Sequence, residues 1–338
     1  MEKEKRLSIR DIAEELNTSI TTVSFVINGR DKEKRISDHL VDRIKKHIEM
    51  VGYIPSNAAK TLRTGKSYTL GLIVEDISDP FFASIAQHIE DQAYENGYKV
   101  VYCSTYNNAD KTLDILNMFH SRSVDGYIVV PPPGIESKLE FLMNSGKPVI
   151  LLDRKLPLLQ TDSVLINNYQ SAFNAAVHLI EKGYKNIGFV TFFNDQVQMV
   201  ERVAGYTDAL TGHTMQPIVK KLPYNRTADA LIPEITEFIT STPGLDAIIF
   251  GTNRDAIQGL KAIRNLGLSI PGDIAVITFD DSDVFQMYTP AITSIAQPVK
   301  DIATHVITTL LSRLNGAGSK NTFQSTILET NLIVRAST

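Results

Sequence analysis

A chain of 338 residues is too long for one small domain and predicts two or three domains. With 43% hydrophobic and 21% charged residues, the composition is that of an ordinary soluble globular protein, and no apolar run reaches the roughly 18 residues of a membrane helix. The N-terminus lacks an apolar signal segment, and the single cysteine, Cys103, excludes an internal disulfide. These features exclude secreted and membrane proteins, so we expect a cytoplasmic protein without a membrane partner.

Charge is distributed unevenly along the chain. The net charge is −4 in total, but residues 1–66 carry +4 and the remaining 272 residues carry −8. A basic head on an acidic body indicates that only the first part of the chain meets a polyanion.

Residues 1–54, called the head below, predict three short helices. The first spans residues 8–16 and begins at Ser8, a possible N-cap. The second runs from about Ser19 to Asn28, and the third follows Ser37 and ends near Gly52. Two short helices joined by a tight turn and followed by a third predict an all-α helix–turn–helix DNA-binding domain.

The second helix, which would enter the DNA groove, contains no Arg, Lys or Gln. A helical projection places Val23, Val26 and Ile27 on its inner side. The outer side then carries Ile20, Thr21, Ser24, Phe25 and Asn28. Hydroxyl groups there can bond phosphates or base edges, and the apolar side chains can contact thymine methyl groups. Without an Arg–guanine contact we expect modest specificity, and a helix of a protein-interaction domain is the alternative.

Residues 55–67, called the hinge below, follow the third helix. Asn57 to Arg63 are compatible with a helix of about two turns, which is marginal on its own in water. Leu62 is the one large apolar residue of this segment, and Lys60 adds a positive charge for phosphates. A leucine beside small residues is a device that kinks DNA from the minor groove. A plain basic linker is the alternative.

From Tyr68 onward, apolar strands alternate with amphipathic helices, which predicts parallel sheets covered on both faces. Strands are expected at residues 68–76, 98–104, 124–131, 147–153, 186–193, 245–251 and 273–281. The series restarts near residue 168 and so predicts two doubly wound α/β lobes. Lobe one takes about residues 68–167 with 295–325, and lobe two takes about 168–294 with 326–338. Crossover strands are expected near residues 162–168, 290–297 and 325–331.

Polar side chains gather where the predicted strands end, which is where open α/β sheets bind ligands. The strand ends carry Asp76, Asp153, Asn253 and Asp280. Phe81 and Phe82 follow the first strand, and Arg202 lies in a helix. Carboxylates, an amide and an arginine around an aromatic platform suit a sugar, whose hydroxyls need donors and acceptors and whose C–H face stacks on a ring.

The stretches LSIRDIAEELNTSITTVSFVING and VGYIPSNAAKTLRTGKS resemble the head and hinge of the lactose/galactose-repressor (LacI/GalR) family of bacterial transcription regulators. The resemblance extends through the rest of the chain and implies a core like the periplasmic sugar-binding proteins. It also implies a homodimer on a near-palindromic DNA operator, with hinge helices that order on DNA. Together with the capping residue Ser8, the expected DNA contacts are Ile20, Thr21, Thr22, Ser24, Phe25, Asn28, Asn57, Ala59, Lys60 and Leu62. The expected effector contacts are Asp76, Phe81, Phe82, Asp153, Arg202, Asn253 and Asp280.

Two positions depart from the usual pattern of this family. Phe25 stands where the family often has an Arg or His that reads a base, and Arg254 stands where an Asp usually follows the asparagine. With Arg154 and Arg202, Arg254 makes the cleft less acidic than usual. We therefore expect a sugar or a sugar phosphate as the effector.

No phosphate-binding glycine loop, metal motif or nucleophile motif occurs, and the seven histidines lack metal-like spacing. The sequence predicts a ligand-responsive repressor of carbohydrate-utilisation genes, with no catalytic residue, metal or cofactor. Effector binding would move lobe one and so form or melt the hinge helices. The alternative is a cytoplasmic sugar-binding protein or sugar-processing enzyme, which leaves residues 7–66 without a role. A protein-interaction scaffold explains neither the polar strand ends nor the hinge.

Overall fold

The computed structural model describes residues 7–53, 65–193, 196–224, 227–316 and 322–338. The chain divides into two compact units, Met1–Ser67 and Tyr68–Thr338, and the second is called the core below. Among the described residues, no helix has the length and apolar character needed to cross a membrane.

Over its described residues 7–53, the head contains three helices, α1 (Ile9–Glu15), α2 (Ile20–Ile27) and α3 (Asp38–Met50). Local capping sets their ends. Ser8 and Asp11 form a reciprocal capping box at the start of α1, and the Ser19 hydroxyl accepts from the Thr22 amide at 3.0 Å to start α2. Gly29 ends α2 with a φ of +65°, which glycine adopts at little cost. The predicted helix–turn–helix is therefore confirmed.

The head has its own small core, in which the three helices meet. Ile12 of α1, Val23 of α2 and Ile44 of α3 are fully buried there. Burial of such side chains is the main stabilising contribution in a domain of this size. The spacing that predicted the inner side of α2 is confirmed, since Val23 and Val26 are buried and Ile27 is half-buried.

Lobe one of the core is a six-stranded, all-parallel sheet in the order β11-β5-β4-β3-β1-β2. Its strands are β1 (Thr69–Val74), β2 (Lys99–Ser104), β3 (Gly126–Val129), β4 (Val149–Leu152), β5 (Asp162–Ile166) and β11 (Ser325–Leu328). Its helices are α5 (Pro80–Glu95), α6 (Ala109–Ser121), α7 (Glu136–Asn144) and α13 (Val299–Leu314). Helix α13 packs on α5, whereas α6 packs on α7.

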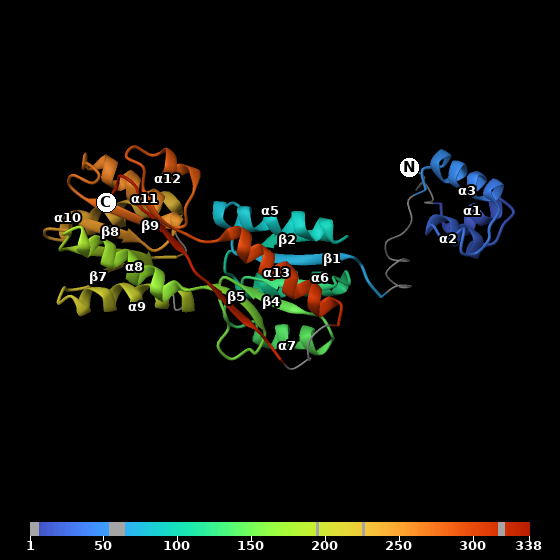
Figure 1. Ribbon diagram of the computed structural model, residues 1–338, viewed down its shortest axis with the longest axis horizontal. Coiled ribbons are helices and arrows are strands. Elements are labelled where there is room, and N and C mark those ends of the chain that lie inside the picture. Colours follow the sequence, from blue (N-terminus) through green and yellow to red (C-terminus); the bar gives the residue numbers. More distant parts are fainter. Residues whose placement is uncertain (1–6, 54–64, 194–195, 225–226, 317–321) are drawn as a thin grey trace. The chain divides into compact units, whose positions relative to one another are not determined.

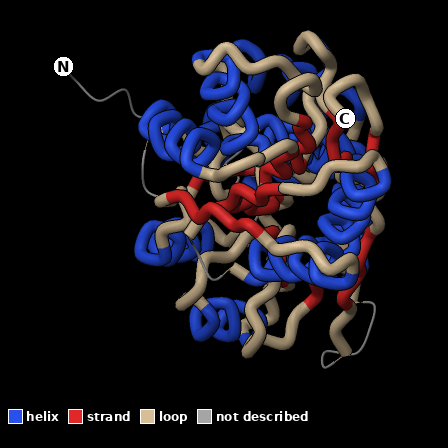
Figure 2. The backbone as a smooth tube through the Cα atoms, turned by 90° about the vertical axis from the view of Figure 1, so that its left-hand side faces the viewer, coloured by secondary structure: helices blue, strands red, loops and turns tan. Residues whose placement is uncertain are grey.

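Lobe two repeats this plan with the order β12-β10-β9-β8-β6-β7, in which only β12 is antiparallel to its neighbour. Its strands are β6 (Ile187–Phe192), β7 (Ile218–Leu222), β8 (Ala247–Phe250), β9 (Ala275–Phe279), β10 (Thr293–Ala296) and β12 (Asn331–Ile333). Its helices are α8 (Asn168–Glu181), α9 (Val197–Gly212), α10 (Ile232–Ser241), α11 (Asn253–Asn265) and α12 (Asp283–Met287), with a short 3-10 turn at Ala228–Leu231. Figures 1 and 2 show the strands of the core enclosed by helices.

The chain crosses between the lobes after β5, after β10 and after β11. The predicted lobe boundaries near residues 295 and 325 need correction. Residues 326–328 pair with β5 in lobe one, because β11 continues the parallel sheet there. Residues 295–296 belong to β10 and therefore to lobe two. Strand β7 was not predicted, because it is an edge strand with a single buried residue, Leu222, and so lacks an apolar run.

Candidate functional site

A cavity lies between the two lobes of the core, at the carboxyl ends of the strands. Its empty space is about 530 Å³ when the part open to solvent is included. Both lobes contribute side chains to it, which is the position where open parallel sheets bind ligands. The residues that line it are Glu75, Asp79, Phe81, Phe82, Asp153, Arg154, Phe192, Gln196, Gln198, Met199, Arg202, Tyr224, Thr252, Asn253, Arg254, Asp280 and Gln297.

Six of the seven side chains predicted to contact an effector line this cavity: Phe81, Phe82, Asp153, Arg202, Asn253 and Asp280. The expectation for Asp76 needs correction. Its carboxylate accepts from the amide and hydroxyl of Ser78 at 2.9 and 2.8 Å, and it does not line the cavity. Glu75, one residue earlier, lies in the cavity wall instead, because successive side chains at a strand end point in opposite directions.

Asp153 and Asp280 occupy equivalent places in the two lobes, directly after β4 and β9. Both have left-handed backbones, with φ values of +68° and +65°. Aspartate adopts this conformation more readily than most residues other than glycine. The neighbouring Asp281 points away from the cavity and pairs with both terminal nitrogens of Arg335 at 2.7 Å.

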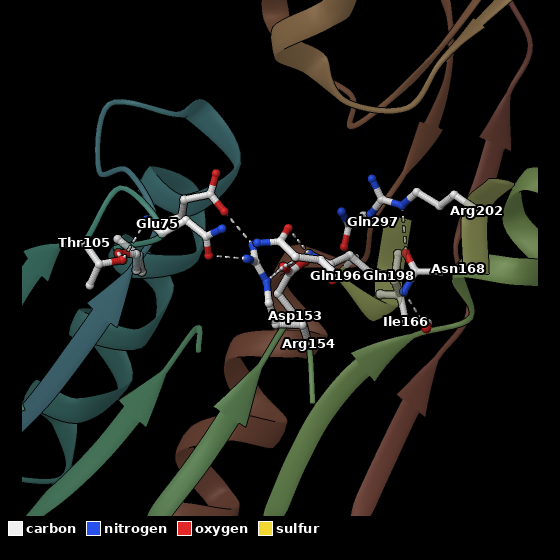
Figure 3. Close-up of polar contacts among 12 residues, drawn as sticks. Glu75, Thr105, Asp153, Arg154, Ile166, Asn168, Gln196, Gln198, Arg202 and Gln297 are labelled. Atoms are coloured by element: carbon white, nitrogen blue, oxygen red, sulfur yellow. Dashed lines mark hydrogen bonds and ion pairs between the residues drawn. The ribbon is translucent and has the colours of Figure 1, made fainter. Parts of the chain in front are cut away.

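Arg154 crosses the lobe-one side of the cavity and is almost fully buried (Figure 3). It donates to Glu75 at 2.6 Å, to Asp153 at 3.1 Å and to Asn107 at 3.1 Å. Burial alone lowers the pKa of Arg154, but the charges of Asp153 and Glu75 outweigh it and raise the pKa. This guanidinium is therefore charged and already neutralised by two carboxylates.

Arg202 extends from α9 and is also buried. Its Nε donates to Asn168 at 2.8 Å and its Nη1 to the carbonyl of Gly251 at 2.7 Å. The guanidinium lies 3.9 Å from the centroid of the Phe279 ring. Burial lowers its pKa, and Asp280 opposes that shift. Its Nη2 makes no hydrogen bond with the described residues, so Arg202 can still donate to a ligand.

The two lobes touch directly through Asn253 and Asp79. The Asn253 amide nitrogen, at the start of α11, donates to the Asp79 carboxylate at 2.8 Å. Burial and the nearby charge of Asp280 raise the pKa of Asp79 to about 6. Burial also raises the pKa of Asp280, against the charge of Arg202 and a 2.6 Å hydrogen bond from Gln297. Since burial takes water away from both carboxylates, a ligand that donates hydrogen bonds to them would stabilise them.

A second link between the lobes runs from Tyr224, whose hydroxyl donates to Glu75. Tyr224 meets Phe192 edge to face, with the ring centroids 5.6 Å apart. The guanidinium of Arg254 lies 5.3 Å from the Phe192 ring and 5.8 Å from the Tyr224 ring. Tyr224 was missed because it follows the unpredicted strand β7; an aromatic residue after that strand was the only signal for it.

The predicted DNA contacts of α2 lie on the exposed side of the head. Thr21 and Asn28 are exposed, Ile20 is 42% exposed, and Ser24 and Phe25 are half-buried. The Thr22 amide is used by the Ser19 cap, and the Asn28 side chain donates to the Ser24 carbonyl at 2.6 Å. Ser8 is occupied by its capping box. The hinge residues Asn57, Ala59, Lys60 and Leu62 lie outside the described residues.

Within the part of the chain that the structure describes, no group of three His, Cys, Asp or Glu side chains could hold a metal ion. The cavity instead offers carboxylates, amides, three guanidinium groups and aromatic rings. Such a set binds and orients a polar molecule through hydrogen bonds and stacking.

Comparisons with known proteins agree with both units. Residues 8–56 match the lacI family of bacterial regulatory proteins, and residues 176–338 match the periplasmic binding protein-like domain. Catabolite control protein A of Priestia megaterium is 32% identical over 326 residues, which cover 96% of each chain. The lac repressor dimer bound to operator and the anti-inducer ONPF has a TM-score of 0.83 at 20% identity, covering 98% of this chain and 99% of that one. The complex of the transcriptional regulator CelR with cellobiose has a TM-score of 0.72 at 25% identity, covering 98% and 100%. The chain belongs to the lacI family of bacterial regulatory proteins.

Proposed function

We propose that this DNA-binding transcriptional regulator represses carbohydrate-utilisation genes and that a sugar binds in the cavity between its lobes to control DNA binding. The observation that carries the proposal is the convergence of Asp153, Arg202, Asn253 and Asp280, from both lobes, on one cavity. Carboxylates accept from sugar hydroxyls, whereas Arg202 and Asn253 can donate to them. Phe81 and Phe82, whose ring centroids lie 5.1 Å apart, supply an apolar surface for the C–H face of the ring.

The charges in the cavity favour a neutral sugar over a sugar phosphate. Arg154 directs its donors to Glu75, Asp153 and Asn107, so it is not available to bind a phosphate. Arg254 lies over two aromatic rings. Four carboxylates (Glu75, Asp79, Asp153 and Asp280) line the same space and would repel an anion. The similar regulator CelR has been solved with cellobiose, a neutral sugar, which supports this choice.

We further propose that the chain binds DNA as a homodimer in the cytoplasm. The DNA contacts assigned to it are Ser8, Ile20, Thr21, Thr22, Ser24, Phe25 and Asn28 of the head, and Asn57, Ala59, Lys60 and Leu62 of the hinge. The exposed side of α2 supports the head contacts, and the solved lac repressor dimer on its operator supports the dimer. Two heads on one duplex explain why the operator would be near-palindromic.

Control by the effector follows from the links between the lobes. Asp79–Asn253 and Glu75–Tyr224 connect lobe one, which continues into the hinge, with lobe two. A sugar that bonds these same side chains changes the balance between lobe arrangements, and DNA affinity changes with it. The sugar then either releases DNA or promotes its binding.

Isothermal titration of the full chain with a panel of neutral sugars and their phosphates tests this proposal. We expect saturable binding of a neutral sugar, weaker binding of its phosphate, and a change in DNA affinity at saturation. Turnover of the bound sugar would instead support a sugar-processing enzyme. Binding of phosphorylated compounds alone would contradict the neutral-sugar proposal.

A further inference from the structure

The loop between α2 and α3 carries the basic residues that α2 lacks. Helix α2 reads ITTVSFVI, without any charged side chain. The loop over residues 29–37 follows directly and contains Arg30, Lys32, Lys34 and Arg35. A head that binds DNA needs positive charge, because phosphate contacts supply a large share of the affinity.

Two of these basic side chains fold back onto the ring of Phe25. The guanidinium carbon of Arg30 lies 5.7 Å from the ring centroid, and the Lys34 ammonium nitrogen lies 5.5 Å from it. Both distances are within the range of a cation–π contact, roughly 6 Å. The backbone supports the arrangement, since the Arg30 amide donates to the Phe25 carbonyl at 2.9 Å and the Lys34 amide donates to the Arg30 carbonyl at 3.1 Å. Phe25 therefore orders cations beside the exposed side of α2.

The same two cations share one carboxylate. Glu33 accepts from Nε and Nη2 of Arg30 at 2.7 Å each and pairs with Lys34 at 3.0 Å. These hydrogen bonds lower the pKa of Glu33 to about 2, so it is ionised at neutral pH. The side chains of Arg30, Glu33 and Lys34 are 43%, 52% and 39% exposed. Ion pairs this exposed contribute little to stability and can exchange for another anion.

We propose that Phe25 is a platform for DNA phosphate contacts. Its ring holds Arg30 and Lys34 next to the DNA backbone, beside the major groove that α2 enters. When DNA binds, the two cations exchange the carboxylate of Glu33 for phosphates. The inference rests on the proposed DNA-binding function of the head. It assigns affinity to the loop and leaves base readout to Ile20, Thr21 and Asn28. Phe25 stands where the family often has an Arg or His that reads a base. As a platform for cations, Phe25 has a role that needs no contact with a base.

The test measures the affinity of the full chain for a selected duplex at several salt concentrations. Each phosphate contact contributes about 0.9 to the slope of log affinity against log salt. We expect Arg30→Ala and Lys34→Ala to lower the magnitude of the slope by about that amount each. Both should weaken binding equally on operators that differ in base sequence, because phosphates carry no sequence information.

Three further variants separate the platform from a general effect of charge. Phe25→Leu keeps an apolar side chain but removes the ring, so the magnitude of the slope of log affinity against log salt should decrease here too. Glu33→Gln frees both cations and should raise the affinity at low salt. Lys45→Ala removes the same charge from an exposed site on α3 and serves as the matched control. Circular dichroism and thermal unfolding confirm that each variant is folded.

The outcomes separate this inference from the function on which it rests. Slopes that do not change in Arg30→Ala and Lys34→Ala, or that fall as much in Lys45→Ala, overturn the platform. A loss of binding confined to one base sequence overturns it as well, since it would show base readout. A native chain without salt-dependent DNA binding contradicts the proposed function itself.

Discussion

The Asn253 amide of lobe two donates a 2.8 Å hydrogen bond to the Asp79 carboxylate of lobe one. Asp79 is also the N-cap of α5, where it accepts from the Phe81 amide at 2.9 Å. The carboxylate of Asp79 thus orders the start of α5, the pair Phe81 and Phe82 that follows it, and the contact between the lobes. A ligand that accepts from the same N–H of Asn253 must displace Asp79.

We predict that Asp79 makes the free energy of unfolding depend on pH. Its pKa of about 6 in the folded protein exceeds the value of about 3.9 in an unfolded chain. Folding then takes up a proton between these pH values, so the free energy of unfolding falls as the pH rises from about 4 to 6. The shift of about 2 units corresponds to about 3 kcal/mol. Asp79→Asn cannot ionise and should escape this loss.

Thermal or urea unfolding at several pH values measures the effect. The stability of Asp79→Asn minus that of the native chain should rise between pH 4 and 6 and then level off. Burial raises the pKa of Asp255 to about 7, so Asp255 also makes the free energy of unfolding depend on pH. This contribution is similar in both proteins and cancels in the difference. A difference that does not vary with pH would show that Asp79 is not the cause.

Asp280→Asn should weaken sugar binding while the fold is retained. The carboxylate lies in the cavity wall, and a hydrogen bond to a charged group contributes about 1.5–3 kcal/mol, which is about 10- to 150-fold in affinity. Asp281→Asn is the matched control, because Asp281 points to Arg335 outside the cavity. That variant should lower the melting temperature and leave sugar affinity unchanged in calorimetry. Equal losses of affinity in both variants would contradict the assignment.

Tyr224→Phe should weaken the link between the lobes. The change removes the hydroxyl that donates to Glu75 and leaves this carboxylate without its lobe-two partner. We expect a lower melting temperature of the core and weaker sugar binding, because the arrangement of the lobes that forms the cavity is less populated. Tyr94→Phe, at a 77% exposed position of α5, should change neither quantity. Sugar affinity equal to that of the native chain would exclude a role for this link in binding.

Gly205→Ala should strongly destabilise lobe two. Helices α8 and α9 pack closely, and a Cβ at Gly205 would lie 2.0 Å from the carbonyl oxygen of Tyr169, a backbone atom that cannot rotate away. A cost of more than about 2 kcal/mol is expected. Gly212→Ala in the same helix meets nothing within 4 Å and should be neutral or stabilising by up to about 1 kcal/mol. Urea unfolding of both variants measures the difference, and similar stabilities would contradict the account of this packing.

Much of the fold was predictable because its determinants are local. Ser8, Ser19 and Gly29 mark helix ends that need only their own neighbours in the chain. The buried strands of both sheets are apolar runs such as AVITF in β9. Strand β7 lacked this signal, because an edge strand with its first four residues partly exposed can keep lysines.

Polar residues at strand ends made much of the site predictable. Asp153 and Asp280 follow their strands directly, whereas a shift of one residue at the end of β1 exchanged Glu75 for Asp76 in the prediction. The partnership of Tyr224 with Glu75 joins residues 149 positions apart and has no local signal. Phe25 could be read only as a groove-facing apolar side chain, because the return of Arg30 and Lys34 onto its ring depends on the loop conformation.

Selection of the full chain on a pool of random duplexes, at near-physiological salt and with or without a mixture of neutral sugars, tests the central claim most directly. The account predicts a near-palindromic duplex with a fixed central step, and an enrichment that the sugars raise or lower in the native chain but not in Asp280→Asn. No enriched duplex in either arm would contradict the claim that this chain is a sugar-responsive DNA-binding regulator.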